Sequence, residues 1–205
     1  MLDAARAAGV AVREVPREDL DAVGSDHQGV VARIESPREL GERDLSTWEF
    51  TDDAVVVVLD GVTDPQNLGA AARSAEAGGA EMLVTRIRRA APVTPAAVAA
   101  SAGALLHVPH ARLANIPRAL ERLAERGFTI VGLDGSATAT VYDEGCPEGP
   151  VAVVIGSEGE GMARLSREQC DRLVSLPMLG RIASLNAAAS LAAVLYSYVL
   201  PSRRS

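Results

Sequence analysis

The chain has 205 residues, of which 48% are hydrophobic, enough for one well-buried domain and a small appendage. Its net charge of −7 argues against a general polyanion binder, although local basic patches can still bind RNA. The two cysteines fit neither a metal spacing nor a disulfide framework, no apolar run reaches the ~18–20 residues that span a bilayer, and the N-terminus lacks a signal-peptide pattern. We therefore expect a cytoplasmic protein.

The first 52 residues predict a small structured segment followed by a connection. Residues 1–24 indicate a short helix, an apolar strand over 10–15, and a second helix that begins at Pro16. The following residues are polar and rich in turn formers, and we assign 36–52 as a linker. A separate domain is predicted over 53–205.

From residue 55 onwards, apolar segments alternate with helical ones. VVVVLD at 55–60 is typical of a strand buried inside a parallel sheet, and Asp64-Pro65 is typical of a helix start, with Gly78-Gly79 as its end. Further strands are predicted over 81–85, 107–110, 128–134, 151–156 and 173–177, and further helices over 96–106, over 117–126, after a Ser166 cap, and over roughly 185–199. The alternation predicts an α/β fold, a mainly parallel sheet with helices on both faces.

The segment 59–79 is the first that suggests chemistry. It is predicted as a strand end, a tight turn and a capped helix. Because ligands of such sheets bind outside the carboxyl ends of strands, Asn67 and Arg73 are placed near a site. The alternative is an ordinary amphipathic helix with one solvated arginine.

The segment 153–166 places three glycines directly after a buried strand, which indicates close approach of the backbone to another group. Glu158 and Glu160 would repel a phosphate, and the chain has no lysine for a Walker loop. A neutral or cationic ligand such as S-adenosylmethionine fits better. The alternative is a glycine-rich surface turn.

The segment 176–200 is predicted as a strand end, a loop and a long helix capped by Ser184. Asn186 would lie in the first turn, where free N–H groups favour developing negative charge. Taken alone, both residues can be plain helix-start residues. A nicotinamide oxidoreductase, the alternative at the level of the fold, lacks support because no GxGxxG motif occurs.

Together the three segments resemble the ordered motifs of the SpoU family of S-adenosylmethionine-dependent RNA 2'-O-ribose methyltransferases. They are D-x-x-x-D-P-x-N-x-G-x-x-x-R at 60–73, I-G-S-E-G-E-G at 155–161 and L-P-M-x-G-x-x-x-S-L-N at 176–186. The resemblance covers residues 55–200. It implies the SPOUT fold, in which the C-terminal segment threads a loop to form a deep trefoil knot.

The resemblance also implies roles for individual residues. Arg73 would stabilise the alkoxide that develops on the ribose, and no metal would be required. The backbone of the knot would bind the cofactor at Gly156, Leu176, Leu185 and Leu133. The remaining candidate catalytic residues would orient the ribose or shape the pocket: Ser184, Asn186, Asn67 and Glu158.

The family works as a homodimer with its active site at the interface, and the last helix forms part of that interface. We therefore expect a stripe of small and apolar residues on this helix to make the dimer contact, the alternative being that it faces its own sheet. The stripe comprises Ala187, Ala188, Leu191, Leu195 and Tyr198.

Residues 1–35 resemble the closing portion of the ribosomal-protein-like RNA-binding domain that precedes many SpoU enzymes. The pattern A-x-x-x-G-V-A-V-x-x-V followed by H-Q-G-V-V-A is typical of the branch that methylates guanosine in 23S ribosomal RNA, although the first part of that domain is missing from this sequence. Ribosomal RNA is thus the expected partner. A transfer-RNA ribose methyltransferase and a non-catalytic RNA-binding relative are the alternatives.

Overall fold

The computed structural model describes residues 2–24, 27–35, 37–143 and 145–203, and divides into two compact units, Met1–Ser36 and Pro37–Ser205. The first unit contains α1 (Leu2–Ala7) and α2 (Arg17–Asp21), neither of which has a buried residue. The strand predicted over 10–15 is wrong, because these residues form no strand. An isolated strand leaves its backbone N–H and C=O groups without a ladder partner, so an apolar run alone does not produce one.

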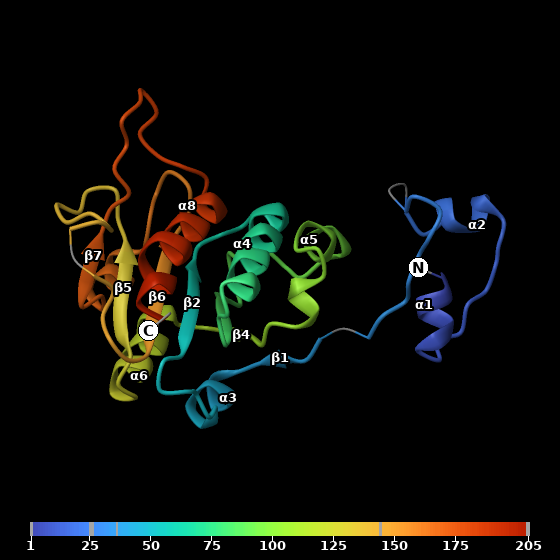
Figure 1. Cartoon of the computed structure of the whole chain (residues 1–205), viewed down its shortest axis with the longest axis horizontal. Coiled ribbons are helices and arrows are strands. Elements are labelled where there is room, and N and C mark those ends of the chain that lie inside the picture. The colour runs from blue at the N-terminus through green and yellow to red at the C-terminus, as the bar shows by residue number, and fades with distance from the viewer. Residues whose placement is uncertain (1, 25–26, 36, 144, 204–205) are drawn as a thin grey trace. The chain divides into compact units, whose positions relative to one another are not determined.

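The second unit is built on a parallel sheet, which confirms the predicted fold class (Figure 1). In the described part of the chain the strand order is β1-β4-β3-β2-β6-β5-β7, and every pairing is parallel. The strands are β1 (Glu39–Leu40), β2 (Val55–Asp60), β3 (Met82–Arg86), β4 (His110–Leu113), β5 (Thr129–Leu133), β6 (Val151–Gly156) and β7 (Arg172–Val174). β2 and β6 are adjacent at the centre and buried throughout, as expected for strands covered on both faces.

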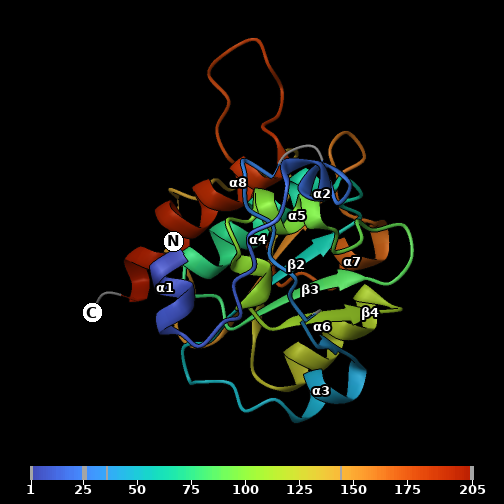
Figure 2. The same cartoon turned by 90° about the vertical axis from the view of Figure 1, so that its right-hand side faces the viewer.

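Helices cover both faces of this sheet (Figure 2). One face carries α4 (Pro65–Ala77), α5 (Pro95–Ala100), the 3-10 turn η1 (Ala104–Leu106) and α8 (Ala187–Val194), which share one hydrophobic cluster with β2 and β6. The other face carries α3 (Glu42–Thr47), α6 (Ile116–Glu125) and α7 (Arg164–Glu168). No helix of the described residues is long and apolar enough to cross a membrane.

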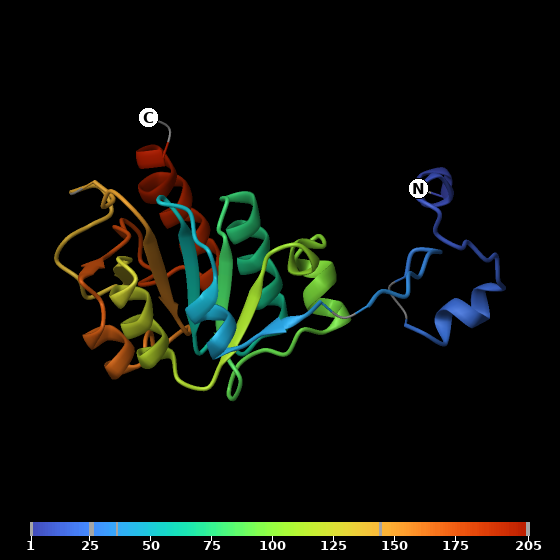
Figure 3. The same ribbon diagram turned by 90° about the horizontal axis from the view of Figure 1, so that it is seen from below.

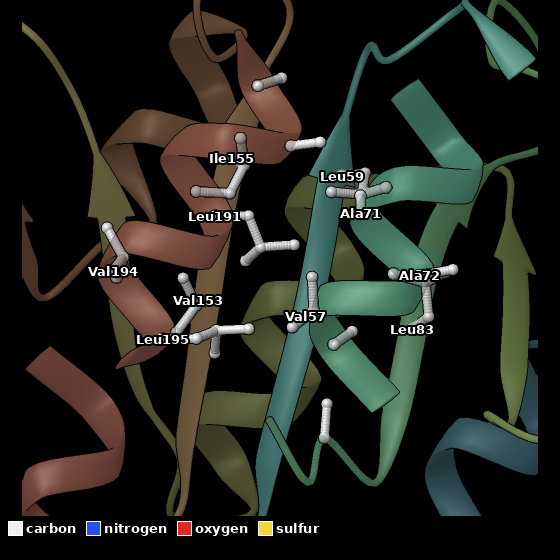
Figure 4. Close-up of a cluster of buried hydrophobic side chains, with 14 of the residues drawn as sticks. Val57, Leu59, Ala71, Ala72, Leu83, Val153, Ile155, Leu191, Val194 and Leu195 are labelled. Atoms are coloured by element: carbon white, nitrogen blue, oxygen red, sulfur yellow. The ribbon is translucent and has the colours of Figure 1, made fainter. Parts of the chain in front are cut away.

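Small side chains let α4 and α8 lie side by side on their face of the sheet (Figure 3). Ala71 of α4 lies beside Leu59 of β2, Ala72 lies beside Leu83 of β3, and Leu191 of α8 points between β6 and β2 (Figure 4). Burying such a leucine side chain contributes roughly 1.5–3 kcal/mol. The placement of α4 and α8 matters for function, because each helix begins beside the carboxyl ends of the central strands.

The apolar stripe of the last helix belongs to this core, so its assignment to a dimer contact is wrong. α8 continues into η2 (Leu195–Val199) and η3 (Leu200–Arg203). The stripe residues are at most 7% exposed within the single chain: Ala187, Ala188, Leu191, Leu195 and Tyr198. Helical periodicity shows that a face is apolar but not what covers it.

Helix starts with a cap and a proline were predicted correctly, whereas boundaries set by tertiary packing were not. Asp64 accepts the N–H of Gln66, and Thr94 accepts that of Ala97. The predicted helix over 96–106 stops at Ser101 and resumes as η1, and the strand predicted over 107–110 lies at His110–Leu113. The strand predicted over 173–177 ends at Val174.

Two further differences concern residues assigned as a cap or a linker. Ser166 lies buried inside α7, whose N-cap is Ala163. Residues assigned to the linker form β1 and α3, and β1 pairs with β4 through Glu39↔His110 and Leu40↔Ala111. A two-residue edge strand is too short for its periodicity to be recognised.

The buried imidazole of His110 predicts a pH-dependent stability. Burial, followed by the charge of Arg112, lowers its pKa from 6.5 to about 4, against the opposing effect of Glu39. The folded state therefore holds a neutral ring, 2.8 Å from Thr85 Oγ1, while the unfolded chain takes up a proton below pH 6.5. We expect the free energy of unfolding to fall by on the order of 3 kcal/mol from pH 6.5 to pH 4 because of this group.

Urea unfolding of His110→Gln across this pH range tests the prediction. The variant should show a shallower pH dependence than the wild type, whereas His107→Asn, at an exposed position, should retain the wild-type slope. Equal slopes for His110→Gln and the wild type would contradict it.

Candidate functional site

A pocket of 390 Å³ opens at the carboxyl ends of β5 and β6, the edge at which ligands bind in open α/β sheets. Three chain segments that are distant in sequence meet there. The lining residues are Leu133, Gly135, Ile155, Gly156, Ser157, Glu158, Gly159, Gly161, Leu176, Met178, Ala183, Ser184, Leu185, Ala187 and Ser190. The pocket therefore brings together the second and third predicted segments and the end of β5.

Residues 156–161, the glycine loop, form one wall of the pocket by turning back on themselves. Ser157 and Gly161 exchange two backbone hydrogen bonds of 3.0 Å, and Gly159 and Gly161 have φ of 86° and 71°, which glycine adopts without strain. A Cβ built on Gly156 would lie 2.1 Å from the carbonyl carbon of Gly161. The close approach that requires Gly156 is thus between two parts of the same loop, whereas the sequence had suggested contact with a ligand.

Asp60 fixes the far end of this loop. Its carboxylate is 2% exposed, accepts the N–H of Ala163 at 2.9 Å through Oδ2, and pairs with Arg86 Nη2 at 2.9 Å through Oδ1. A buried carboxylate needs such partners, because an unpaired charge there is costly. The first motif thereby positions the second, a role of Asp60 that sequence reasoning missed.

The third segment forms the opposite wall and projects beyond the sheet between β7 and α8 (Figures 1 and 2). Within the described chain, its residues 176–185 make no hydrogen bond to other backbone groups. Their N–H and C=O groups are therefore available to a ligand. Leu179 and Ile182 of this segment are 99% and 71% exposed, which is unusual for large apolar side chains.

Three predicted catalytic residues meet at the rim of the pocket. Glu158 Oε1 accepts Asn67 Nδ2 at 3.0 Å and Asn186 Nδ2 at 2.6 Å, and Asn186 Nδ2 also lies 2.8 Å from Asn67 Oδ1. The backbone N–H of Ala187 adds a contact of 3.3 Å to the same carboxylate oxygen. These interactions join the starts of α4 and α8 to the glycine loop.

Asn186, and not Ser184, is the N-cap of α8. Its side-chain oxygen accepts the N–H groups of Ala188 and Ala189. Ser184 instead lies two residues earlier, exposed in the pocket lining. Its hydroxyl is thus free of the capping role that the sequence assigned to it.

Arg73 is the one predicted catalytic residue that stands apart. It is exposed and absent from the pocket lining, and no described residue pairs with its guanidinium. Six residues separate it from Asn67, which places it about 9 Å further along α4 and on a different side of the helix. In a single chain, therefore, Arg73 does not face the pocket.

The predicted cofactor contacts all lie in the pocket, while several lining residues were missed. Leu133, Gly156, Leu176 and Leu185 line it as expected. The lining residues that were not among the predicted site residues are Gly135, Ile155, Ser157, Gly159, Gly161, Met178, Ala183, Ala187 and Ser190. For Ser190 a signal was present, because it lies one helical turn after Asn186 and so faces the same side of α8.

The pocket suits an uncharged or cationic organic ligand. Its walls combine leucine, isoleucine and methionine side chains and glycine backbone with serine hydroxyls and the carboxylate of Glu158, and no arginine is among the lining residues. Asp134 lies directly after β5 and accepts hydrogen bonds from Ser136 and Arg167. Burial raises the pKa of its carboxyl group, but these hydrogen bonds outweigh burial and hold the pKa below its usual value. The described residues contain no group of three or more His, Cys, Asp or Glu side chains placed to hold a metal.

Comparison with known families identifies this arrangement. The model described as the SpoU rRNA Methylase family matches residues 54–196. The chain belongs to the SpoU rRNA methylase family. A second model, described as RNA 2'-O ribose methyltransferase substrate binding, matches residues 1–40.

Individual members of the family are similar over most of the chain. A 23S rRNA (guanosine-2'-O-)-methyltransferase, RlmB, of Photobacterium profundum is 40% identical over 93% of this chain and 79% of its own length. Its counterpart in Haemophilus influenzae is 42% identical over 93% and 79%.

Among solved structures, the SpoU methyltransferase AviRb of Streptomyces viridochromogenes, in complex with AdoMet, aligns with a TM-score of 0.69 and 32% identity. The alignment covers 77% of this chain and 61% of AviRb. The chain thus spans less than two thirds of the length of this structural relative.

Proposed function

We propose that this chain transfers the methyl group of S-adenosylmethionine to the 2'-hydroxyl of a guanosine in 23S ribosomal RNA. The observation that carries the proposal is the junction of Asn67, Glu158 and Asn186 at the mouth of a pocket lined by apolar side chains, glycine backbone and serine hydroxyls. The relatives named as 23S rRNA guanosine methyltransferases support the reaction and its substrate. We propose a cytoplasmic location on the same ground, since ribosomal RNA is found there.

The proposed cofactor fits the residues present. Leu133, Leu176 and Leu185 provide apolar walls for a planar base, and the backbone of residues 176–185 and of Gly156 offers hydrogen-bonding groups. When bound, S-adenosylmethionine supplies an electrophilic methyl group on a sulfonium. The lining carries no positive side chain that would repel that cation.

The residues at the rim would hold the ribose. Glu158 is bound by Asn67 and Asn186 on one side, which fixes its carboxylate at the mouth of the pocket. The exposed hydroxyl of Ser184 can donate to or accept from a sugar hydroxyl. Holding the 2'-oxygen in line with the methyl group supplies much of the rate acceleration of such a reaction.

Arg73 would stabilise the negative charge that develops on the 2'-oxygen, while the proton leaves to water or to a phosphate. A guanidinium is a permanent cation at neutral pH, so it acts here as a hydrogen-bond donor and not as a base. Because Arg73 does not face the pocket of its own chain, we infer a homodimer in which the arginine of one protomer serves the pocket of the other.

The exposed side chains of Leu179 and Ile182 beside the pocket support such an interface. We also infer the C-terminal trefoil knot. Its support is that the backbone N–H of Ser175 donates to Ala139 and the carbonyl of Ser175 accepts from Val141, so residues 139–141 run parallel to the chain as it leaves β7.

Calorimetry and a substrate comparison test the proposed function. We expect S-adenosylmethionine to bind and NAD to show no binding, and 23S ribosomal RNA to accept labelled methyl groups while transfer RNA does not. Preferential methylation of transfer RNA would assign the other substrate. Binding of S-adenosylmethionine and RNA without any transfer would indicate a non-catalytic relative.

A further inference from the structure

The loop that follows β3 carries two exposed arginines whose guanidinium groups have no partner among the described residues, Arg88 and Arg89. No motif of the family resemblance includes them. Ile87 beside them is 50% exposed, so residues 87–89 face solvent. Exposed arginines contribute little to the stability of the fold through intramolecular contacts. In a chain of net charge −7, two adjacent arginines without ion-pair partners are therefore candidates for binding an anionic ligand.

The loop lies at the same edge of the sheet as the pocket. In the strand order, β3 is separated from β6 only by β2, so the ends of β3 and β6 are roughly 10 Å apart. Ala91 donates its N–H to Val62 at 2.9 Å, which ties the loop to the turn that precedes α4 and Asn67. The arginines are therefore neighbours of the proposed ribose site.

Both ends of the loop are held in place. Ile87 donates its N–H to Leu113 at 2.9 Å, and Arg112 Nη2 donates to the carbonyl of Ile87 at 3.2 Å. Together with the bond from Ala91, these contacts fix the backbone on either side of the two arginines. Their guanidinium groups are thus displayed from a supported turn, which reduces the entropic cost of binding a ligand.

Among the described residues, the positive charge without an ion-pair partner in this part of the sheet edge comes from Arg88 and Arg89. The neighbouring arginines are neutralised in ion pairs, Arg86 with Asp60 at 2.9 Å and Arg112 with Glu39 at 2.8 Å. Asp64, the cap of α4, is the remaining carboxylate in the adjoining turn and already accepts the N–H of Gln66. Arg88 and Arg89 are thus two cations without an ion-pair partner on the β3 side of the pocket, while the carboxylates of Glu158 and Glu160 lie in the glycine loop on its other side.

The backbone conformation of Arg89 gives further support to a role for this residue in binding. Its φ is 55°, in the left-handed region that residues other than glycine seldom adopt. Glycine would form this turn without strain, so the turn itself does not explain an arginine at this position.

We propose that Arg88 and Arg89 bind phosphate groups of the ribosomal RNA strand beside the nucleotide held at the pocket. The inference rests on the proposed function and extends it by naming a surface for the substrate backbone. The planar guanidinium matches phosphate in a bidentate geometry.

The test compares Arg88→Gln, Arg89→Gln and the double variant with the wild type in direct binding of a 23S ribosomal RNA fragment at several salt concentrations. Removing one arginine–phosphate interaction should reduce the slope of log affinity against log salt by about 0.7, so the double variant should show a slope reduced by about 1.4. Its affinity for RNA should fall about tenfold at physiological salt, with the turnover number at saturating RNA and the affinity for S-adenosylmethionine unchanged.

Arg43→Gln is the matched control. It removes one exposed arginine from α3, on the other face of the sheet, and should leave the salt slope unchanged. A wild-type slope in the double variant would overturn the inference while leaving the proposed function intact. A wild-type protein that binds RNA with the expected arginine dependence but transfers no methyl group would overturn the proposed function alone.

Discussion

Replacing Arg73 with alanine should lower the rate of methyl transfer by about 10²–10³-fold, the usual cost of losing one preorganised donor to a developing charge. The affinity for S-adenosylmethionine and the free energy of unfolding should stay at wild-type values, because Arg73 is exposed and does not line the pocket. Arg73→Lys should recover little, since a flexible point charge does not reproduce the planar fork. Single-turnover kinetics at saturating cofactor and RNA measure the effect. A wild-type rate for Arg73→Ala would make the arginine a simple surface residue.

Mixing two inactive variants tests whether Arg73 acts across the dimer. In a mixed dimer, the Arg73→Ala protomer keeps an intact glycine loop and pocket, and the Gly156→Ala protomer keeps an intact Arg73. If Arg73 acts across the dimer, these two parts form one complete site. Random mixing should restore about a quarter of the wild-type activity per chain, because half of the dimers are mixed and each has one complete site. If Arg73 served the pocket of its own chain, the mixture would stay inactive. Sedimentation of each variant provides the control that dimers form.

Replacing Gly156 with alanine should abolish binding of S-adenosylmethionine. The added Cβ would lie 2.1 Å from the backbone of Gly161 and 2.2 Å from that of Met162, so the glycine loop must move out of its position in the pocket wall. We expect an affinity loss of more than about 100-fold, with a stability cost of roughly 1–3 kcal/mol from the forced backbone shift.

The matched control for this change is Gly24→Ala, because a Cβ at Gly24 meets no atom within 4 Å and Gly24 does not line the pocket. Calorimetry with S-adenosylmethionine and thermal unfolding of both variants separate the loss of the site from the loss of the fold. Wild-type cofactor affinity in Gly156→Ala would contradict the role given to the glycine loop.

The sequence was sufficient for the parallel sheet apart from β1, for most helices and for the segments that meet at the site. Buried apolar strands and cap-and-proline helix starts are local signals, so β2, β6 and the start of α4 could be predicted from short windows. The motif resemblance added the expectation that Gly156, Leu176 and Leu185 contact the cofactor, and all three line the pocket.

What could not be predicted depends on contacts between distant residues. Ser184 and Asn186 are both good cap formers, and the choice between them follows from the hydrogen bonds that Asn186 makes with Glu158 and Asn67. The apolar stripe of α8 was predicted to face a second chain, although Leu191 and Leu195 are fully buried in their own core. Periodicity identifies an apolar face, whereas only the packed structure shows which surface covers it.

The central claim is methyl transfer to a ribose oxygen of guanosine, and mass spectrometry of nucleosides tests it most directly. Purified protein, S-adenosylmethionine and unmodified 23S ribosomal RNA are incubated, and the RNA is then digested to nucleosides. The proposed function predicts one new product, 2'-O-methylguanosine, which is absent when Arg73→Ala replaces the wild type over the same short time. A methyl group on a base, or no methylated nucleoside from a dimeric protein that binds both S-adenosylmethionine and RNA, would contradict the claim.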